Sequence, residues 1–237
     1  MQRLIDTALN EVGYLEKASN KDLYSKTANA GKKNYTKYAK EMSVFSPGIY
    51  ANGYAWCDTF VDWCFVKAYG DKAKELIHGW SAYTPTSASY YKQHGQWHTS
   101  PKIGDQVFFK DASGTICHTG IVYKVDGGNV YTVEGNTSYA SGVVANGGGV
   151  AKKSYPKDYN RIAGYGRPDY SMVVNPKKKE ETKVYNSVND CPDWAKPYVQ
   201  TAVNNGYIKG DGNGNINLDD TKIWCLAVML RIAGIMA

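Results

Sequence analysis

Cys57 is the residue of this chain whose surroundings best suit nucleophilic chemistry. It follows a segment rich in turn residues, 46–53, and precedes an apolar pattern with helical spacing, so we expect it in the first turn of a helix. The free N–H groups and partial positive charge of a helix N-terminus favour a thiolate over a thiol. The sequence therefore predicts a cysteine nucleophile at this position.

A thiol nucleophile needs a base, and two strand-like segments supply His118 and Glu134. We expect His118 to take the thiol proton and later to protonate the leaving amine, while Glu134 accepts a hydrogen bond from the other imidazole nitrogen. Asn136 lies two residues beyond Glu134, so it shares that face of an extended strand and either assists the ring or polarises the substrate. The backbone N–H of Cys57 is the first expected oxyanion donor.

The positions of His118 and Glu134 set a condition on the hairpin between them, whose turn is expected at residues 126–129. Their separation is even, so both side chains share a face only if the loop has an odd number of residues or if a bulge intervenes. The two consecutive glycines of the turn favour a three-residue loop with one glycine in the left-handed region. We predict that loop.

The elements that must position these residues follow from the hydrophobic periodicity. Helices are expected at residues 1–16, 34–42, 57–70, 71–78 and 85–94. Strands are expected at residues 105–109, 118–125, 130–134, 150–155 and 161–165. A helical start followed by short strands and Gly-rich turns predicts an α+β fold with an antiparallel sheet.

The chain divides at residues 175–183, a charged segment without apolar residues that is typical of a linker. We therefore expect a catalytic domain at residues 1–174 and a small all-helical domain at 184–237 with helices near 192–205 and 219–232. The net charge of +6 divides into +7 for residues 1–183 and −1 for the rest. This mild positive field favours an anionic polymer, but it is too diffuse for nucleic-acid binding.

The sequence also indicates in which cellular compartment the protein is made. No apolar run is long enough to span a membrane, and the N-terminus lacks a secretory signal, so we expect synthesis in the cytoplasm and no membrane insertion. The five cysteines have no zinc-ligand spacing and are expected to be free thiols in that compartment. Cys64 is expected in the core, and Cys191 and Cys225 are the pair that could meet.

Four segments occur in the order of the successive motifs of one family: YAWCDTFV at 54–61, KIGDQVFF at 102–109, CHTGIV at 117–122 and VEGNTS at 133–138. Over roughly residues 1–170 the chain resembles the CHAP family of papain-like peptidoglycan hydrolases, which act as amidases or endopeptidases. The resemblance implies Cys57 as nucleophile, His118 as base, Glu134 as orienting acid and Asn136 as the fourth site residue.

Two features separate this chain from related proteins. A neighbouring branch of wall peptidases uses Cys–His–His, whereas here Glu134 holds the third position and no histidine follows His118. Some CHAP domains bind calcium through an acidic loop just before the nucleophile, and this chain has no Asp-x-Asp cluster there. We therefore expect no metal and no cofactor. Trp56, Trp80 and Trp97 either line a groove for a glycan–peptide strand or pack in the core.

The C-terminal unit resembles a single S-layer homology motif, a family that anchors proteins to cell-wall polysaccharide. The similar residues lie at 187–195, 202–210 and 211–217, whereas the family's Ile-Thr-Arg-Ala-Glu stretch is replaced at 220–224. Anchoring usually uses three copies, so a single copy would bind weakly or self-associate. The alternative is a helical cap packed on the enzyme.

Together these resemblances imply a phage-endolysin-like enzyme that reaches the bacterial wall through a holin pore. We expect it to cleave the N-acetylmuramoyl–L-alanine bond by Cys–His–Glu thiol catalysis. An endopeptidase of the stem or cross-bridge peptide, a non-catalytic wall-binding protein and an intracellular cysteine protease are the alternatives. Its expected partners are peptidoglycan and wall polysaccharide.

Overall fold

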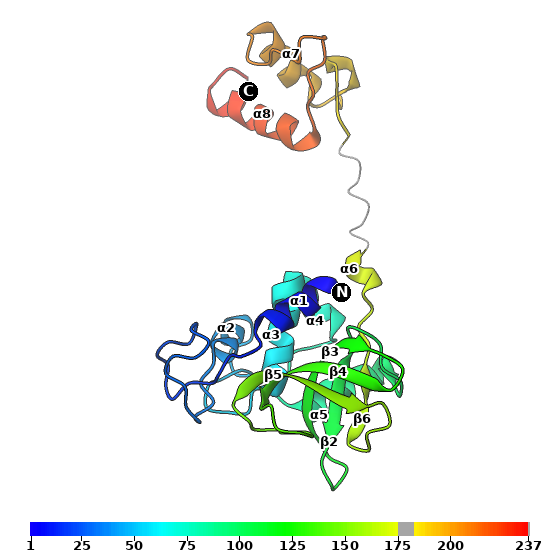
Figure 1. Ribbon diagram of the computed structural model, residues 1–237. Coiled ribbons are helices and arrows are strands. Elements are labelled where there is room, and N and C mark those ends of the chain that lie inside the picture. Colours follow the sequence, from blue (N-terminus) through cyan, green and yellow to red (C-terminus); the bar gives the residue numbers. More distant parts are fainter. Residues whose placement is uncertain (175–182, 237) are drawn as a thin grey trace. The chain divides into compact units, whose positions relative to one another are not determined.

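The computed structural model describes residues 1–174 and 183–236. The chain forms two compact units, Met1–Val174 and Asn175–Ala237 (Figure 1). The linker expected at residues 175–183 lies, apart from Lys183, outside the described residues. No helix within the described ranges is long and apolar enough to cross a membrane.

The first unit begins with helices, as its periodicity predicts. They are α1 (Gln2–Asn10), α2 (Lys37–Phe45), α3 (Cys57–Tyr69), η1 (Gly70–Lys72), α4 (Ala73–Leu76), α5 (Thr84–Gln93) and, after the strands, α6 (Ser171–Val174). The Thr36 side chain caps α2 by accepting the Ala39 N–H. Gly70 ends α3 with a φ of 57°, a left-handed value that a glycine adopts without strain.

Six antiparallel strands follow and form one sheet. They are β1 (Trp97–His98), β2 (Gln106–Lys110), β3 (Ile116–Val125), β4 (Asn129–Thr137), β5 (Gly149–Pro156) and β6 (Ile162–Gly166). Their order across the sheet is β1-β6-β2-β3-β4-β5. The predicted α+β class with an antiparallel sheet is confirmed.

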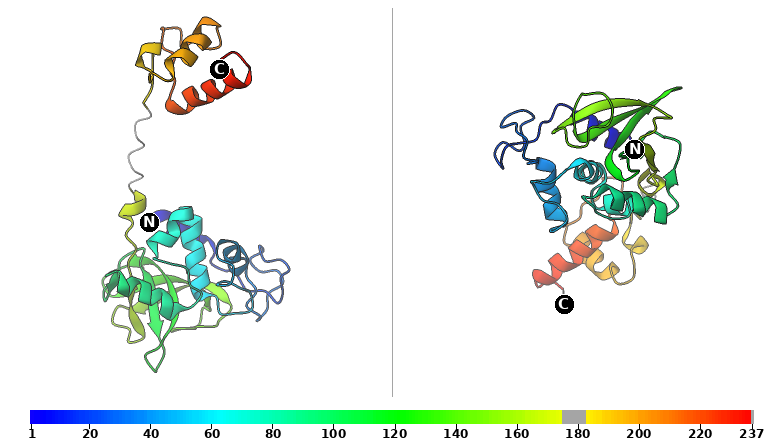
Figure 2. Two further views of the ribbon diagram at one scale, coloured as in Figure 1. Left: turned by 180° about the vertical axis from the view of Figure 1, so that it is seen from behind. Right: turned by 90° about the horizontal axis from the view of Figure 1, so that it is seen from below.

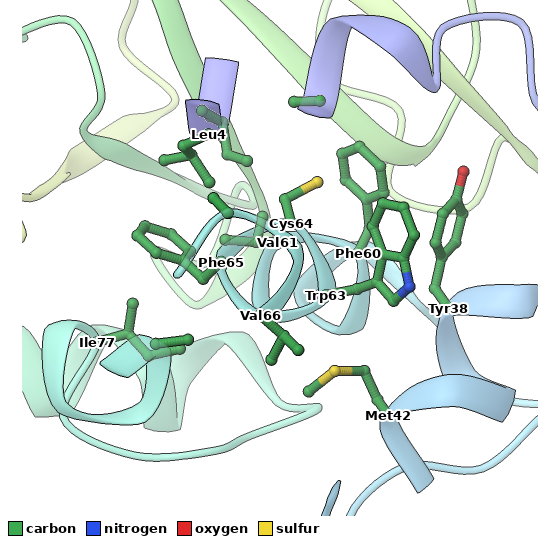
Figure 3. Close-up of a cluster of buried hydrophobic side chains, with 14 of the residues drawn as sticks. Leu4, Tyr38, Met42, Phe60, Val61, Trp63, Cys64, Phe65, Val66 and Ile77 are labelled. Carbon is green, nitrogen blue, oxygen red and sulfur yellow. The ribbon is translucent and has the colours of Figure 1, made fainter. Parts of the chain in front are cut away.

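Helix α3 is the centre of the larger hydrophobic core. It packs against α1 and α2 and against strands β3 and β4, and Figure 2 shows the sheet and the helices from two further sides. Eleven of its thirteen residues are buried, and Figure 3 shows Phe60, Cys64 and Phe65 within this core. The expectation that Cys64 is a core residue is consistent with its zero exposure. A helix buried on nearly all sides holds its first residue in a fixed position.

The second unit contains η2 (Val188–Asp190), α7 (Lys196–Asn204) and α8 (Asp220–Ile232). Asp219 caps α8 by accepting the Lys222 N–H. The two helices share a small core that includes Tyr198, Ala202 and Leu230. The helical class expected for this unit is confirmed, with one isolated bridge between Tyr185 and Leu218.

Candidate functional site

Cys57 is the first residue of α3, with Trp56 as the N-cap. The first N–H groups of a helix have no partner within it, so the Cys57 N–H is available to a ligand. Trp56 is 1% exposed and donates its indole N–H to Oε2 of Glu16 at 3.0 Å. That bond and the packing of the indole fix the backbone immediately before the thiol.

Asp58 fixes the backbone immediately after Cys57. Its buried carboxyl group accepts hydrogen bonds from Ser87 Oγ at 2.6 Å and from Gln106 Nε2 at 3.1 Å. Burial raises the pKa of Asp58 to about 7, and both hydrogen bonds oppose that rise. The first turn of α3 is thus tied to helix α5 and to strand β2.

His118 and Glu134 form a buried pair on adjacent strands. Nε2 of His118 lies 2.9 Å from Oε2 of Glu134, and both side chains are fully buried. Nδ1 of His118 has no hydrogen-bond partner among the described residues. Because Nε2 is occupied by Glu134, Nδ1 is the nitrogen left to exchange a proton with a thiol.

The surroundings of His118 favour its charged form. Burial alone lowers its pKa, but the proximity of Cys57 and the hydrogen bond and charge of Glu134 raise it to about 9. Cys57 and Glu134 are therefore the two neighbours that stabilise an imidazolium. An imidazolium near a cysteine stabilises the thiolate form, which is the reactive nucleophile.

A bulge in β3, and not a three-residue loop, brings His118 and Glu134 to one face. The hairpin closes with the pair Val125–Val130, and the register shifts by one residue between Val122 and Lys124. The predicted three-residue loop with a left-handed glycine is therefore wrong. The carboxylate of Asp126 accepts the N–H groups of Gly128 and Asn129, which closes the turn without positive φ at either glycine.

Gly120 gives Glu134 the space to reach the histidine. The register of Ile121 with Val133 places Gly120 opposite Glu134, diagonally next to His118. A Cβ atom on Gly120 would lie 2.5 Å from Cγ of Glu134 and 2.9 Å from the Val133 carbonyl oxygen. Any larger residue at this position would displace the carboxylate.

Two further side chains hold the Glu134 carboxylate. Thr132 Oγ1 donates to Oε1 at 2.5 Å, and the Tyr155 hydroxyl donates to Oε2 at 3.3 Å. Burial and the nearby carboxylate raise the pKa of Tyr155 well above its ordinary value, so its hydroxyl remains a donor. Neither residue was predicted from the sequence, although the i, i+2 spacing of Thr132 and Glu134 places them on one face of a strand.

Asn136 is positioned differently from the sequence expectation. Its φ is 54°, and the pairing of β4 with β5 shifts register between Glu134 and Thr137. Its Oδ1 accepts the Gly148 N–H at 3.4 Å, and its backbone carbonyl accepts the Gly147 N–H at 2.8 Å. Within the described ranges, Asn136 makes no hydrogen bond to His118, and its fully buried Nδ2 donor has no partner. Its role as the fourth site residue stays a prediction.

The three tryptophans considered for a substrate groove have different places. Trp56 is buried, and the Trp97 ring packs 5.4 Å from that of Phe108. Trp80 lines an open groove together with Ala55 and Thr59, which lie on either side of Cys57 in the sequence. Among the described residues no group of three His, Cys, Asp or Glu side chains could hold a metal ion.

The cysteines other than Cys57 take no part in this cluster. Cys64 is buried in the core, and Cys117 is half-buried with its pKa raised by burial. Cys191 is buried and Cys225 is exposed, and the two are not bonded to each other.

Comparison with known proteins agrees with this cluster. Residues 49–136 match the model of the CHAP domain, and that stretch includes all four predicted catalytic residues. One similar solved structure, the crystal structure of Ly7917, aligns with 13% sequence identity and a TM-score of 0.39. The alignment covers 70% of this chain, and the chain spans 61% of that structure. No curated protein matches the chain significantly. Residues 49–136 are thus similar to the CHAP domain, which is found in cysteine- and histidine-dependent amidohydrolases and peptidases that act on peptidoglycan.

Proposed function

We propose that this chain cleaves an amide bond of bacterial peptidoglycan with Cys57 as nucleophile, His118 as acid–base and Glu134 as the group that orients the imidazole. The observation that carries the proposal is the buried His118–Glu134 pair whose free nitrogen is left for the thiol. Cys57 stands at a helix N-terminus inside the matched CHAP region.

The proposed reaction has two stages, acylation and deacylation of the thiol. His118 takes the thiol proton at Nδ1, the Cys57 sulfur attacks the amide carbonyl carbon, and the negative charge that develops on oxygen is stabilised by the Cys57 N–H. His118 transfers its proton from Nδ1 to the departing amine, leaving a thioester on Cys57. A water molecule, deprotonated by the neutral imidazole, then hydrolyses the thioester and restores the thiol. Glu134 holds Nε2 throughout, so that Nδ1 faces the reacting atoms.

Within this class we favour the N-acetylmuramoyl–L-alanine bond, with an endopeptidase of the stem or cross-bridge peptide as the second candidate. Mass spectrometry of digested sacculi separates them, because an amidase releases stem peptides with a free alanine amino group. An intact lactyl–alanine link in every product would overturn the amidase assignment.

The nucleophile itself is tested by Cys57→Ala. We expect this variant to release no new amino groups from sacculi, whereas Cys64→Ala, which changes a core thiol, should retain the chemistry. Equal release by Cys57→Ala and the wild type would contradict thiol catalysis and leave the non-catalytic wall-binding function. Hydrolysis of casein but not of sacculi would instead identify a general cysteine protease.

We further propose that the second unit binds wall polysaccharide, alone or by self-association, and that the protein acts as an endolysin made in the cytoplasm and released through a holin pore. The support is the S-layer-homology-like sequence and the exposure of Trp194, Tyr207 and Trp224. Sedimentation with sacculi should decrease when the chain is ended at Val174. Undiminished binding of the shortened chain would refute the wall-binding role, and ultracentrifugation of the full chain reports self-association.

A further inference from the structure

A groove of about 540 Å³ borders the start of the nucleophile's helix. It is lined by Gly48, Ile49, Ala51, Tyr54, Ala55, Thr59, Trp80, Ser81, Ala82 and Tyr83. Because Ala55 and Thr59 are each two residues from Cys57, the groove borders the peptide segment that carries the thiol. Its volume is in the range of ligand sites.

The side chains that line the groove favour an uncharged ligand. None of the ten lining residues carries a charge. Tyr54 and Tyr83 are 71% and 64% exposed, so their rings are free to contact a ligand. Thr59 and Ser81 add hydroxyl groups at the same surface. Aromatic faces with a few neutral polar groups suit a ring that has apolar faces and a hydroxyl or amide rim.

A free carboxylate or ammonium group would be poorly accommodated in this groove, because it would lose water without meeting an opposite charge. Stem peptides of peptidoglycan carry such groups, whereas an N-acetylated sugar in amide linkage does not. A second hollow, lined by Glu16, Lys32, Gly147 and Gly148 among others, does carry charge and adjoins the segment that Asn136 contacts. The uncharged groove therefore fits the sugar better than the peptide.

The walls of the groove are held in place before any ligand arrives. Oδ2 of Asp62, one turn along α3 from the first helical residues, accepts the Tyr50 hydroxyl at 2.5 Å and the Ser81 N–H at 3.2 Å. Asp62 is 1% exposed. One buried carboxyl group thus fixes both the segment around residue 50 and the segment around residue 81 to the nucleophile's helix. Such prior ordering lowers the entropic cost of binding.

We infer that this groove binds the N-acetylated sugar that bears the scissile amide, with the rings of Tyr54 and Tyr83 contacting the sugar. The inference rests on the proposed function, because it assigns the glycan side of the same substrate. It requires that the acyl side of the bond be the muramoyl group.

The test uses the full chain with Cys57→Ala and a neutral probe, N-acetylglucosaminyl-N-acetylmuramoyl methylamide, with binding followed by calorimetry or NMR titration. We expect Tyr83→Ala and Tyr54→Ala each to weaken binding of this disaccharide by roughly fivefold. Tyr24→Ala is the matched control, because Tyr24 is 62% exposed and lies outside the groove lining. A sugar-free stem peptide should not displace the disaccharide.

Three outcomes would overturn the inference: no binding of the disaccharide, equal binding by the Tyr83→Ala and Tyr24→Ala variants, or displacement by the sugar-free peptide. Since these are surface tyrosines, a circular dichroism spectrum and melting curve suffice to confirm that each variant is folded. Failure of the proposed function is recognised separately, because wild type and Cys57→Ala would then release equal amounts of amine from sacculi.

Discussion

Replacing Glu134 by Gln is the sharpest test of the His118 environment. The change keeps the side-chain shape but removes the negative charge 2.9 Å from Nε2 of His118. A hydrogen bond to a charged group contributes about 1.5–3 kcal/mol, and one pKa unit corresponds to about 1.36 kcal/mol. The pKa of His118, about 9 in the intact protein, should therefore fall to about 7–8 in Glu134→Gln.

The assay is the pH dependence of kcat/KM for amine release from soluble peptidoglycan fragments. Its alkaline limb reports loss of the imidazolium proton that the leaving amine requires. We expect this limb near pH 9 in the wild type and one to two pH units lower, roughly, in Glu134→Gln. Glu16→Gln is the matched control, because Glu16 is also buried but bonds Trp56 and not His118. An alkaline limb that stays near pH 9 in Glu134→Gln would show that the Glu134 charge does not raise the pKa of His118.

The raised pKa of His118 also makes the stability of the folded protein depend on pH. A histidine whose pKa is raised on folding stabilises the protein fully below its ordinary value of 6.5 and loses that contribution as the pH rises through about 9. At 1.36 kcal/mol per unit, the difference amounts to about 3 kcal/mol at most. The melting temperature of the wild type should decrease across this window, and that of Glu134→Gln should decrease at lower pH.

Two further changes probe the support of Glu134. Gly120→Ala should destabilise the protein by about 1–3 kcal/mol through overpacking, so both the melting temperature and kcat/KM should fall. Gly127→Ala, whose added Cβ meets nothing within 4 Å, should change neither. Full activity in Gly120→Ala would contradict the predicted crowding of Glu134. Thr132→Val removes the donor to Oε1 of Glu134 and should lower kcat roughly tenfold with little change in KM. Thr132→Ser keeps the hydroxyl and should recover most of the loss, and a failure of this rescue would assign Thr132 to packing alone.

Local sequence was enough to place Cys57 at a helix N-terminus. The helical spacing after the turn-rich segment predicts a helix beginning near residue 57, and the structure begins α3 at Cys57. Whether that residue points at a base is a question about distant parts of the chain, which a local pattern does not answer.

The hairpin shows the limit of local rules. The even separation of His118 and Glu134 correctly required either an odd loop or a bulge, but the glycines favoured the wrong choice between them. The Asp126 side chain closes a loop with an even number of residues, and the bulge near Tyr123 puts His118 and Glu134 on the same face of the sheet. Several turn types are close in energy for such sequences, so the register of the packed sheet decides among them.

The order of the elements and the candidate cysteine–histidine chemistry can be read from the sequence alone, because helix starts, strand alternation and residue types are local properties. The set of neighbours around Glu134, in contrast, becomes visible only in the folded protein. Tyr155, twenty-one residues further along the chain, reaches it from the neighbouring strand β5, and Gly120 makes room for it across the β3–β4 ladder. Strand pairing creates these contacts, and the pairing is fixed by the burial of whole faces of the sheet, a property that no short segment of the chain contains.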